Sequence, residues 1–234
     1  MKKMITVQDH RSPSLSPLNP WFFYPFLIWV IVGGILLGTF DRRHLFEMVN
    51  GRHSEPLDIF MSTLTHFGTG QIMILILLIL MAAPKFRNWW FVITAVLCIS
   101  LPALVIQILK AIFNAPRPFE YFKADPSWIH FSQNWGDRLY HHSFPSGHSG
   151  GAFSMYCLLA LLLPRRYRWL GLPLFLFALL VGYTRLYLAA HFFLDVYVGS
   201  ILGTLITTLA FWVMNKNVDR FYGTNEPRMS VYDN

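Results

Sequence analysis

The sequence has few charged residues. Asp, Glu, Lys and Arg make up only 13% of its 234 residues, whereas a typical soluble domain carries about 25%. Hydrophobic residues account for 54% of the chain, which is more than a water-soluble globule of this length can hide from water. Intrinsic disorder is excluded as well, because it requires low hydrophobicity. The composition therefore indicates a multi-pass membrane protein.

Cysteine is also scarce. The two cysteines, Cys98 and Cys157, both lie inside apolar runs, and the chain has no CxxC or other thiolate spacing typical of a metal site. We therefore expect two small buried side chains and no disulfide framework. The sequence also lacks an Asn-x-Ser/Thr acceptor for glycosylation. Together with the short loops, this favours a bacterial inner membrane over a eukaryotic membrane.

Long apolar runs, by contrast, are abundant. Six stretches are continuously apolar instead of alternating, which indicates helices and not strands. The expected fold is an all-α bundle of six transmembrane helices over residues 21–214. A flexible N-terminal tail, residues 1–20, and a C-terminal tail, residues 215–234, flank this membrane domain. The six predicted spans are Trp21–Phe40, Phe67–Ala83, Trp89–Phe113, Ser149–Leu163, Trp169–Leu188 and Phe192–Met214.

Six spans place both termini on one side of the membrane, and the charges indicate which side. The termini and the even-numbered loops carry eleven basic and four acidic residues, whereas the odd-numbered loops and adjoining helix ends carry eight of each. Because basic residues concentrate on the cytoplasmic side, we expect both termini in the cytoplasm. The formal net charge of +7 is then a topology signal, and no nucleic-acid partner is expected.

The longest loop, residues 114–148, is expected to face outward. Two interpretations of its aromatic residues remain open: an interfacial belt, or a surface that guides a lipid substrate into a site. The aromatic residues concerned are Phe119, Tyr121, Phe122, Trp128, Phe131, Trp135 and Tyr140.

Polar residues at membrane depth are costly, so clusters of them need an explanation. Two such clusters lie at the outer ends of predicted spans three and four. The first is Lys110 with Arg117, and Arg117 stands between two prolines, so its backbone is stiff and nonhelical. Alone, this pair would be a snorkelling lysine and an interfacial arginine. The second is the small-residue run Phe144-Pro145-Ser146-Gly147-His148-Ser149-Gly150-Gly151.

The second cluster has the composition of an anion-binding helix start. Small residues there leave backbone N–H groups accessible, and the positive end of the helix dipole favours an anion. Ser146 also has the type and position of an N-cap residue. His148, on the predicted first turn, adds a group that can transfer protons.

The third cluster contains Thr184, Arg185, His191 and Asp195. His191 and Asp195 are four residues apart, so on a helix they share a face. A carboxylate that accepts from one imidazole nitrogen leaves the other nitrogen free as a nucleophile or base. Together, the three clusters supply three cations, an N–H cradle, two histidines and a carboxylate. These are the groups that phosphoryl transfer requires, without a metal.

The clusters resemble the three signature motifs of the type 2 phosphatidic acid phosphatase superfamily. The first motif, lysine, six residues and Arg-Pro, matches Lys110 to Arg117-Pro118. The second, Pro-Ser-Gly-His, matches Pro145–His148. The third, Ser-Arg, five residues, histidine, three residues and aspartate, matches Thr184-Arg185 with His191 and Asp195, with threonine in place of serine as its one departure.

The resemblance implies a membrane lipid phosphatase and a role for each motif residue. His191 would attack phosphorus and form a phosphohistidine, Asp195 would orient it, and His148 would protonate the leaving group and then activate water. No metal, cofactor or obligate protein partner is expected. The phosphoryl oxygens would be held by the side chains of Lys110, Arg117 and Arg185 and by the N–H groups of Ser146 and Gly147.

The motifs recognise only the phosphate and leave the lipid open. The candidates are undecaprenyl pyrophosphate, phosphatidylglycerophosphate, phosphatidic acid and the phosphates of lipid A, and some relatives transfer the phosphoryl group to another lipid. We expect the site to act at the extracytoplasmic face of a bacterial inner membrane.

Three other classes of protein fit these residues less well than a phosphatase does. A serine protease using Ser146 and His191 would have no role for the cations. A zinc enzyme using His141, His142, His148 and His191 would need adjacent histidines to reach one metal. A non-enzymatic lipid transporter would place charges near the midplane, whereas these lie at one side.

Overall fold

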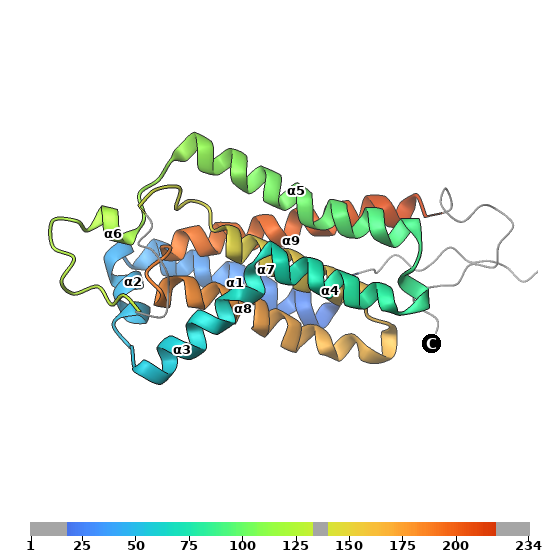
Figure 1. Ribbon diagram of the computed structural model, residues 1–234, viewed down its shortest axis with the longest axis horizontal. Coiled ribbons are helices and arrows are strands. Elements are labelled where there is room, and N and C mark those ends of the chain that lie inside the picture. Colours follow the sequence, from blue (N-terminus) through green and yellow to red (C-terminus); the bar gives the residue numbers. More distant parts are fainter. Residues whose placement is uncertain (1–17, 133–139, 219–234) are drawn as a thin grey trace, which may run out of the picture.

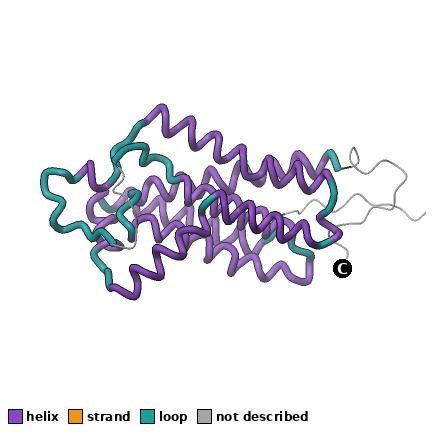
Figure 2. The backbone as a smooth tube through the Cα atoms, in the orientation of Figure 1, coloured by secondary structure: helices purple, strands orange, loops and turns teal. Residues whose placement is uncertain are grey.

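The computed structural model describes residues 18–132 and 140–218, and all regular structure in these ranges is helical (Figure 2). The predicted all-α fold is confirmed. Most of the predicted N-terminal tail 1–20 and C-terminal tail 215–234 lies outside the described residues. The nine α-helices of the described ranges are α1 (Pro20–Thr39), α2 (Arg42–Asn50), α3 (Glu55–Leu64), α4 (Gly70–Ala82), α5 (Trp89–Phe113), α6 (Pro118–Tyr121), α7 (Gly147–Leu162), α8 (Gly171–Tyr187) and α9 (Phe193–Lys216).

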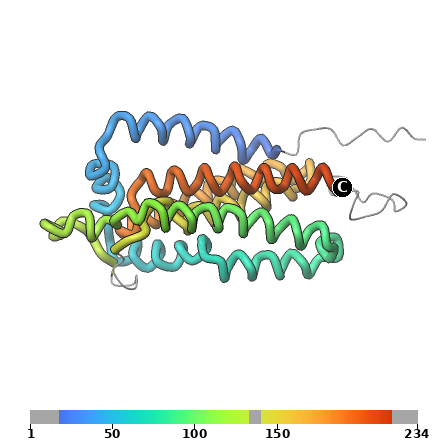
Figure 3. The backbone as a smooth tube through the Cα atoms, turned by 90° about the horizontal axis from the view of Figure 1, so that it is seen from above, coloured from blue at the N-terminus to red at the C-terminus, as the bar shows by residue number. Residues whose placement is uncertain are grey.

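The long helices run side by side as an elongated bundle (Figure 1). Helix α1 begins and α9 ends at the same end of the bundle, while α2, α6 and the loop that precedes α7 gather at the opposite end (Figures 1 and 3). Six of the helices, α1, α4, α5, α7, α8 and α9, occupy the six apolar stretches of the sequence.

Length and composition support four to five membrane spans among the described helices. The four candidates are Pro20–Thr39, Trp89–Tyr121, Arg165–Tyr187 and Phe193–Lys216. A fifth arises if Glu55–Gly68 and Gly70–Ala82, which are bent by 63°, are counted as one broken span. The chain is a multi-pass membrane protein. The length and composition of the described helices identify fewer spans than the six expected from the sequence.

Helix α7 has only 16 residues and occupies the centre of the bundle. It packs against α5, α8 and α9, and nearly all its residues from Ser149 to Leu162 are buried. Protein therefore surrounds this helix, whereas α1 has many exposed apolar side chains, among them Leu27, Ile28 and Ile31. A central helix needs less length than an isolated span, because its ends are covered by neighbouring segments.

Close backbone contact joins α7 to α9. A Cβ atom on Gly203 would lie 2.3 Å from the main-chain oxygen of Gly150, and one on Gly199 would lie 2.6 Å from that of Ser146. Two glycines four residues apart form a small-residue face of the kind that lets membrane helices approach closely. At the end of this contact, the N–H of Ser146 donates to the main-chain oxygen of Asp195 at 2.9 Å. The helix packing thus brings the second and third motifs together.

Helices α2 and α3 were not predicted from the sequence. Helix α2 begins after Asp41, whose side chain accepts from the N–H of His44 at 2.8 Å, and it buries Leu45 and Phe46. Helix α3 leads through a 3-10 turn (η1, Thr65–Gly68) into α4. These two helices lie toward the end of the bundle that α6 occupies (Figure 1).

Candidate active site

His191 lies in the connection between α8 and α9 and is 2% exposed. The prediction that His191 and Asp195 share a helix face is wrong in one respect: only Asp195 is helical. Ala189 has a left-handed backbone with φ of 52°, and the N–H groups of Ala190 and His191 both donate to the main-chain oxygen of Arg185, at 3.0 and 3.1 Å. This turn ends α8 and directs His191 back toward Asp195.

A shared hydrogen-bond network fixes the carboxylate of Asp195. Its Oδ2 accepts from the N–H of Phe192 at 2.9 Å, which caps the start of α9, and from the hydroxyl of Ser143. His191 Nδ1 lies 3.5 Å from the same oxygen and 3.4 Å from Ser143 Oγ. The Nδ1 side of the imidazole therefore faces hydrogen-bond acceptors, which favours the tautomer with the proton on Nδ1.

The opposite nitrogen of His191 faces a cation. Arg117 Nη1 lies 3.4 Å from His191 Nε2 and donates to the main-chain oxygen of Ala190 at 2.8 Å. Its Nε donates to the main-chain oxygen of His141 at 2.8 Å. The guanidinium is thus held in place by main-chain oxygens beside the unprotonated ring nitrogen, which is the nitrogen available for nucleophilic attack.

The charge environment keeps His191 neutral. Burial lowers the pKa of His191 well below its usual range, and the nearby cations Arg117, Arg185 and Lys110 lower it further. A neutral imidazole carries the lone pair that a nucleophile requires, so the resting site holds His191 in its reactive form.

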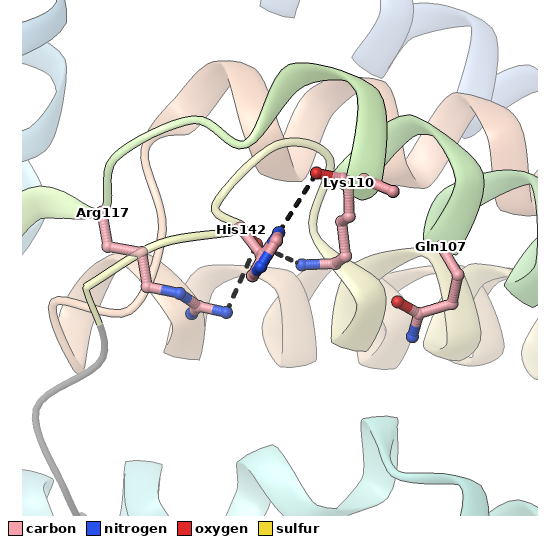
Figure 4. A pocket seen from close by; sticks show the side chains of 5 residues that line it. Gln107, Lys110, Arg117 and His142 are labelled. Atoms are coloured by element: carbon pink, nitrogen blue, oxygen red, sulfur yellow. Dashed lines mark hydrogen bonds between the residues drawn. The ribbon is translucent and has the colours of Figure 1, made fainter.

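Lys110 lies in the last turn of α5 and is 9% exposed. Its Nζ donates to the main-chain oxygen of His142, and the His142 Nδ1 lies 3.2 Å from the main-chain oxygen of Lys110. Figure 4 shows these two residues with Arg117 along a cavity of about 370 Å³, lined by Gln107, Lys110, Ala111, Arg117 and His142.

The start of α7 has the expected capping geometry. The side chain of Ser146 accepts from the N–H of Ser149 at 3.3 Å and from its hydroxyl at 2.9 Å. The N–H of Ser146 itself donates to Asp195, as described above, so in this structure it is not directed at a phosphate. Gly147 is the first residue of the helix, and its Cβ position lies 3.8 Å from Lys110 Cε. Gly147 therefore lies beside the Lys110 side chain at the start of α7.

Arg185 and His148 both lie against η1. Arg185 is 1% exposed, and its Nη1 donates to the hydroxyl of Thr65 at 2.6 Å. A Cβ atom on Gly68 would lie 2.8 Å from the main-chain oxygen of His148, so the backbones touch there. Thr184, the departure from the family motif, donates from its hydroxyl to the main-chain oxygen of Val181 at 2.6 Å, a bond that serine could make equally well.

Residues that the sequence did not single out complete the site. Ser143 contacts both members of the His191–Asp195 pair, and Thr65 holds Arg185. A lone hydroxyl residue has no recognisable spacing, so no sequence signal distinguishes either residue from the other serines and threonines.

A second polar network anchors the loop after α6 beside the site. Asp58 accepts from the Tyr187 hydroxyl at 2.6 Å and lies 2.9 Å from His130 Nε2. The side chain of Asn50 donates to the main-chain oxygens of His130 at 2.9 Å and Tyr187 at 2.8 Å. Tyr187 ends α8, four residues before His191. The network therefore fixes the start of the turn that carries His191.

Some aromatic residues of the loop pack near Phe192, which follows His191 in the chain. Phe122 and Trp128 are half-buried and contact Phe46 of α2, and the ring of Phe192 lies 5.8 Å from that of Phe46. These side chains form a wall beside the site. Trp135, which belongs to the same predicted group, lies outside the described residues.

Within the described ranges, no three His, Cys, Asp or Glu side chains are grouped so that they could hold a metal ion. The four histidines of the zinc alternative therefore do not form such a group. A buried histidine that lies beside a carboxylate and a guanidinium, in a helical membrane protein, has the groups that phosphoryl transfer requires.

The comparison with known families identifies which class of enzyme this is. The PAP2 superfamily model matches residues 91–219, which include all three motifs. The chain belongs to the PAP2 superfamily and is a membrane lipid phosphatase. The family resemblance of the sequence motifs is thus confirmed.

Individual relatives support this assignment at low sequence identity. The chain is similar to an undecaprenyl-diphosphatase of Sulfolobus acidocaldarius, 25% identical over 166 residues, covering 71% of this chain and 75% of the relative. It is also similar to a phosphatidylglycerophosphatase B of Bacillus subtilis, 28% identical over 159 residues, covering 64% of this chain and 71% of the relative.

Two solved structures share the fold. Aquifex aeolicus LpxE superposes with a TM-score of 0.62 at 27% identity, covering 75% of this chain and 98% of that one. A transmembrane PAP2 type phosphatidylglycerolphosphate phosphatase from Bacillus subtilis superposes with a TM-score of 0.59 at 22% identity, covering 88% of this chain and 100% of that one.

Proposed function

We propose that the chain hydrolyses a lipid phosphate or lipid diphosphate through a phosphohistidine formed on His191, without a metal. One observation carries the proposal: the two ring nitrogens of His191 face opposite kinds of group. Nδ1 lies beside Asp195 and Ser143, while Nε2 lies 3.4 Å from Arg117 Nη1. A phosphate bound by Arg117 would therefore present its phosphorus to the unprotonated nitrogen.

In the first step, His191 Nε2 attacks phosphorus, and the bond from phosphorus to the lipid oxygen breaks. The Asp195 carboxylate stabilises the imidazolium that forms. Lys110, Arg117 and Arg185 stabilise the charge on the phosphoryl oxygens, together with the N-terminus of α7. These cations supply the positive charge that a metal ion provides in other phosphatases.

His148 is the proposed acid and base. It lies in the first turn of α7 and protonates the leaving oxygen in the first step. In the second step it takes a proton from the water that attacks the phosphohistidine. Inorganic phosphate leaves, and His191 and His148 return to their starting forms.

The relatives' names support a lipid substrate without choosing one. One is an undecaprenyl-diphosphatase and another a phosphatidylglycerophosphatase, so undecaprenyl pyrophosphate and phosphatidylglycerophosphate are both candidates. Phosphatidic acid and lipid A phosphates remain candidates by the chemistry of the motifs. The apolar residues Leu104, Ile108 and Ile112 are exposed on α5, the helix that carries Gln107 and Lys110 of the cavity, and a lipid chain in the bilayer would lie against them.

We also propose six spans with the site at the extracytoplasmic face of a bacterial inner membrane. Helix α7, the fourth of these spans along the chain, would bring their number to six. It would be shielded from lipid by α5, α8 and α9. The end of the bundle where α1 begins and α9 ends would be cytoplasmic, in agreement with eleven basic and four acidic residues on that side and eight of each on the other.

Phosphate release from a panel of the candidate lipids tests this function. The purified chain in detergent should release phosphate from at least one of them, equally in the presence of EDTA, and orthovanadate should inhibit. His191→Ala should abolish release. Loss of activity in EDTA that Mg²⁺ or Zn²⁺ restores would contradict the metal-independent mechanism. With a substrate labelled in its phosphate, recovery of the label on an acceptor lipid in place of inorganic phosphate would identify a phosphotransferase.

A further inference from the structure

The cavity of about 370 Å³ adjoins the catalytic residues without containing them. Its lining among the described residues is Gln107, Lys110, Ala111, Arg117 and His142, and includes neither His191 nor His148. Arg117 belongs to both places, because it lines the cavity while its Nη1 lies 3.4 Å from His191 Nε2. A ligand that fills both places must therefore pass across the guanidinium of Arg117.

The charges of the cavity favour an anion. Both charged side chains that line it, Lys110 and Arg117, are cations, and each is 9% exposed. Both also contact the main-chain oxygen of His142, Arg117 through Nη2 at 3.5 Å. His142 presents this oxygen from a left-handed backbone with φ of 57°. The two cations are thus held together in one wall, which favours binding of an anionic group.

Gln107 lines the same cavity on the side of Lys110 that is away from Arg117 and His191. It lies three residues before Lys110 on α5, about 4.5 Å closer to the bilayer interior along the helix axis. Figure 4 shows Lys110 between Gln107 and Arg117 in the view. An amide within an apolar helix is costly unless it faces a polar space, and Gln107 lines the cavity. No family motif includes this residue.

We propose that this cavity binds the chain-proximal phosphate of a lipid diphosphate. Gln107 donates to that phosphate and Lys110 lies between the two phosphates, while the terminal phosphate lies against Arg117 and His191. This inference rests on the proposed function and names the substrate class of the same site. It accounts for the order of the groups from the bilayer outward: apolar surface of α5, amide, ammonium, guanidinium and nucleophile.

The reaction then has a defined leaving group. His191 Nε2 forms a bond to the terminal phosphorus, and the bond from that phosphorus to the bridging oxygen breaks. The electron pair stays on the bridging oxygen, which takes the proton of His148 and becomes part of a lipid monophosphate beside Lys110. Water then attacks the phosphohistidine and passes a proton to His148. The net reaction converts a lipid diphosphate and water into a lipid monophosphate and inorganic phosphate.

Two substrates with the same polyprenyl chain, one a diphosphate and one a monophosphate, test the inference. The purified full chain in detergent is assayed for phosphate release, and the measured quantity is the diphosphate-to-monophosphate ratio of kcat/KM. Gln107→Leu removes the amide at similar size. We expect this ratio to fall about tenfold, because a hydrogen bond to a charged group is lost only with the diphosphate.

Gln107→Glu should lower the ratio further, since it places a carboxylate against the proximal phosphate. Val96→Leu, at an exposed position of α5 that does not line the cavity, is the matched control and should leave the ratio unchanged. The ratio does not depend on the fraction of folded protein, so partial misfolding does not imitate the result.

Two results would overturn the inference: an unchanged ratio in both Gln107 variants, or a wild-type chain that hydrolyses the monophosphate but not the diphosphate. Failure of the proposed function looks different. In that case the wild-type chain releases phosphate from neither substrate, or His191→Ala still hydrolyses both.

Discussion

The guanidinium of Arg117 lies with Nη1 3.4 Å from Nε2 of His191, and both residues are buried. Main-chain oxygens of His141 and Ala190 hold the guanidinium there, each at 2.8 Å. The charge is therefore already in place before a substrate binds. Such preorganisation is what makes electrostatic stabilisation effective in a site that excludes water.

Replacement of this arginine by lysine is expected to be severe. Arg117→Lys keeps the charge but loses the planar group that reaches two main-chain oxygens and His191 at once. We expect kcat/KM to fall at least about 100-fold in the phosphate-release assay. Arg166→Lys, at an exposed position in the turn between α7 and α8, is the matched control. Comparable activity of the two variants would show that only the charge of Arg117 matters.

Ser143 is predicted to be a positioning residue for His191. Its hydroxyl donates to Asp195 and lies 3.4 Å from His191 Nδ1. Ser143→Ala should lower kcat about tenfold, the cost of one hydrogen bond to a charged group, with a smaller change in KM. Asp195→Asn should lower kcat by up to about 10⁴-fold, because it favours the wrong imidazole tautomer.

Ser62→Ala controls for the loss of a buried serine hydroxyl, since the described hydrogen bond of Ser62 is to the main-chain oxygen of Ile59 at 3.0 Å and not to His191 or Asp195. Its kcat should equal that of the wild type. An unchanged kcat in Ser143→Ala would remove Ser143 from the mechanism.

The pH dependence should show the low pKa of His191. Burial, with Arg117 and Arg185 nearby, lowers this pKa, so His191 stays neutral and nucleophilic at a pH where an ordinary histidine is protonated. The acid limb of kcat/KM, which reports the free enzyme, should therefore lie below the usual histidine pKa of about 6.5. Two substrates whose phosphates have different pKa values should give the same limb. A limb at or above about 6.5 would contradict the assignment.

Much of the fold was predictable because the apolar runs are long and continuous. The predicted span Trp89–Phe113 coincides with α5, and the predicted start at Trp21 lies one residue from that of α1. Helices α2 and α3 were missed because they are short and only partly apolar, so no run of transmembrane length marks them. The predicted span Phe67–Ala83 is longer than α4, which begins at Gly70, because the chain bends by 63° between η1 and α4.

The site was predictable to the level of its motifs. Their spacing predicted Lys110, Arg117, His148, His191 and Asp195 as site residues, because the chemistry of phosphate binding requires those residue types. The sequence did not reveal that His191 precedes the helix, since a left-handed alanine, Ala189, has no distinguishing sequence signal. It also did not reveal that the Ser146 N–H donates to Asp195, because that contact depends on the approach of α7 to α9.

The orientation of the site in the membrane can be tested by labelling. Asp125 is exposed at the catalytic end, and Arg166 is exposed in the turn between α7 and α8. In a background with Cys98→Ala and Cys157→Ala, Asp125→Cys should react with a membrane-impermeant maleimide in intact cells. Arg166→Cys should react only after lysis. The reverse pattern would place the site in the cytoplasm and make the substrate an inner-leaflet lipid.

The most direct test of the mechanism is detection of the covalent intermediate. The purified chain is mixed with a substrate labelled in the transferred phosphate, quenched in base, and analysed by mass spectrometry under conditions that preserve phosphohistidine. Acid-labile phosphate on the peptide that contains His191, absent from His191→Ala, is the predicted result. Phosphate release by the wild-type chain with no label on His191 at any quench time, or label on another residue, would contradict it.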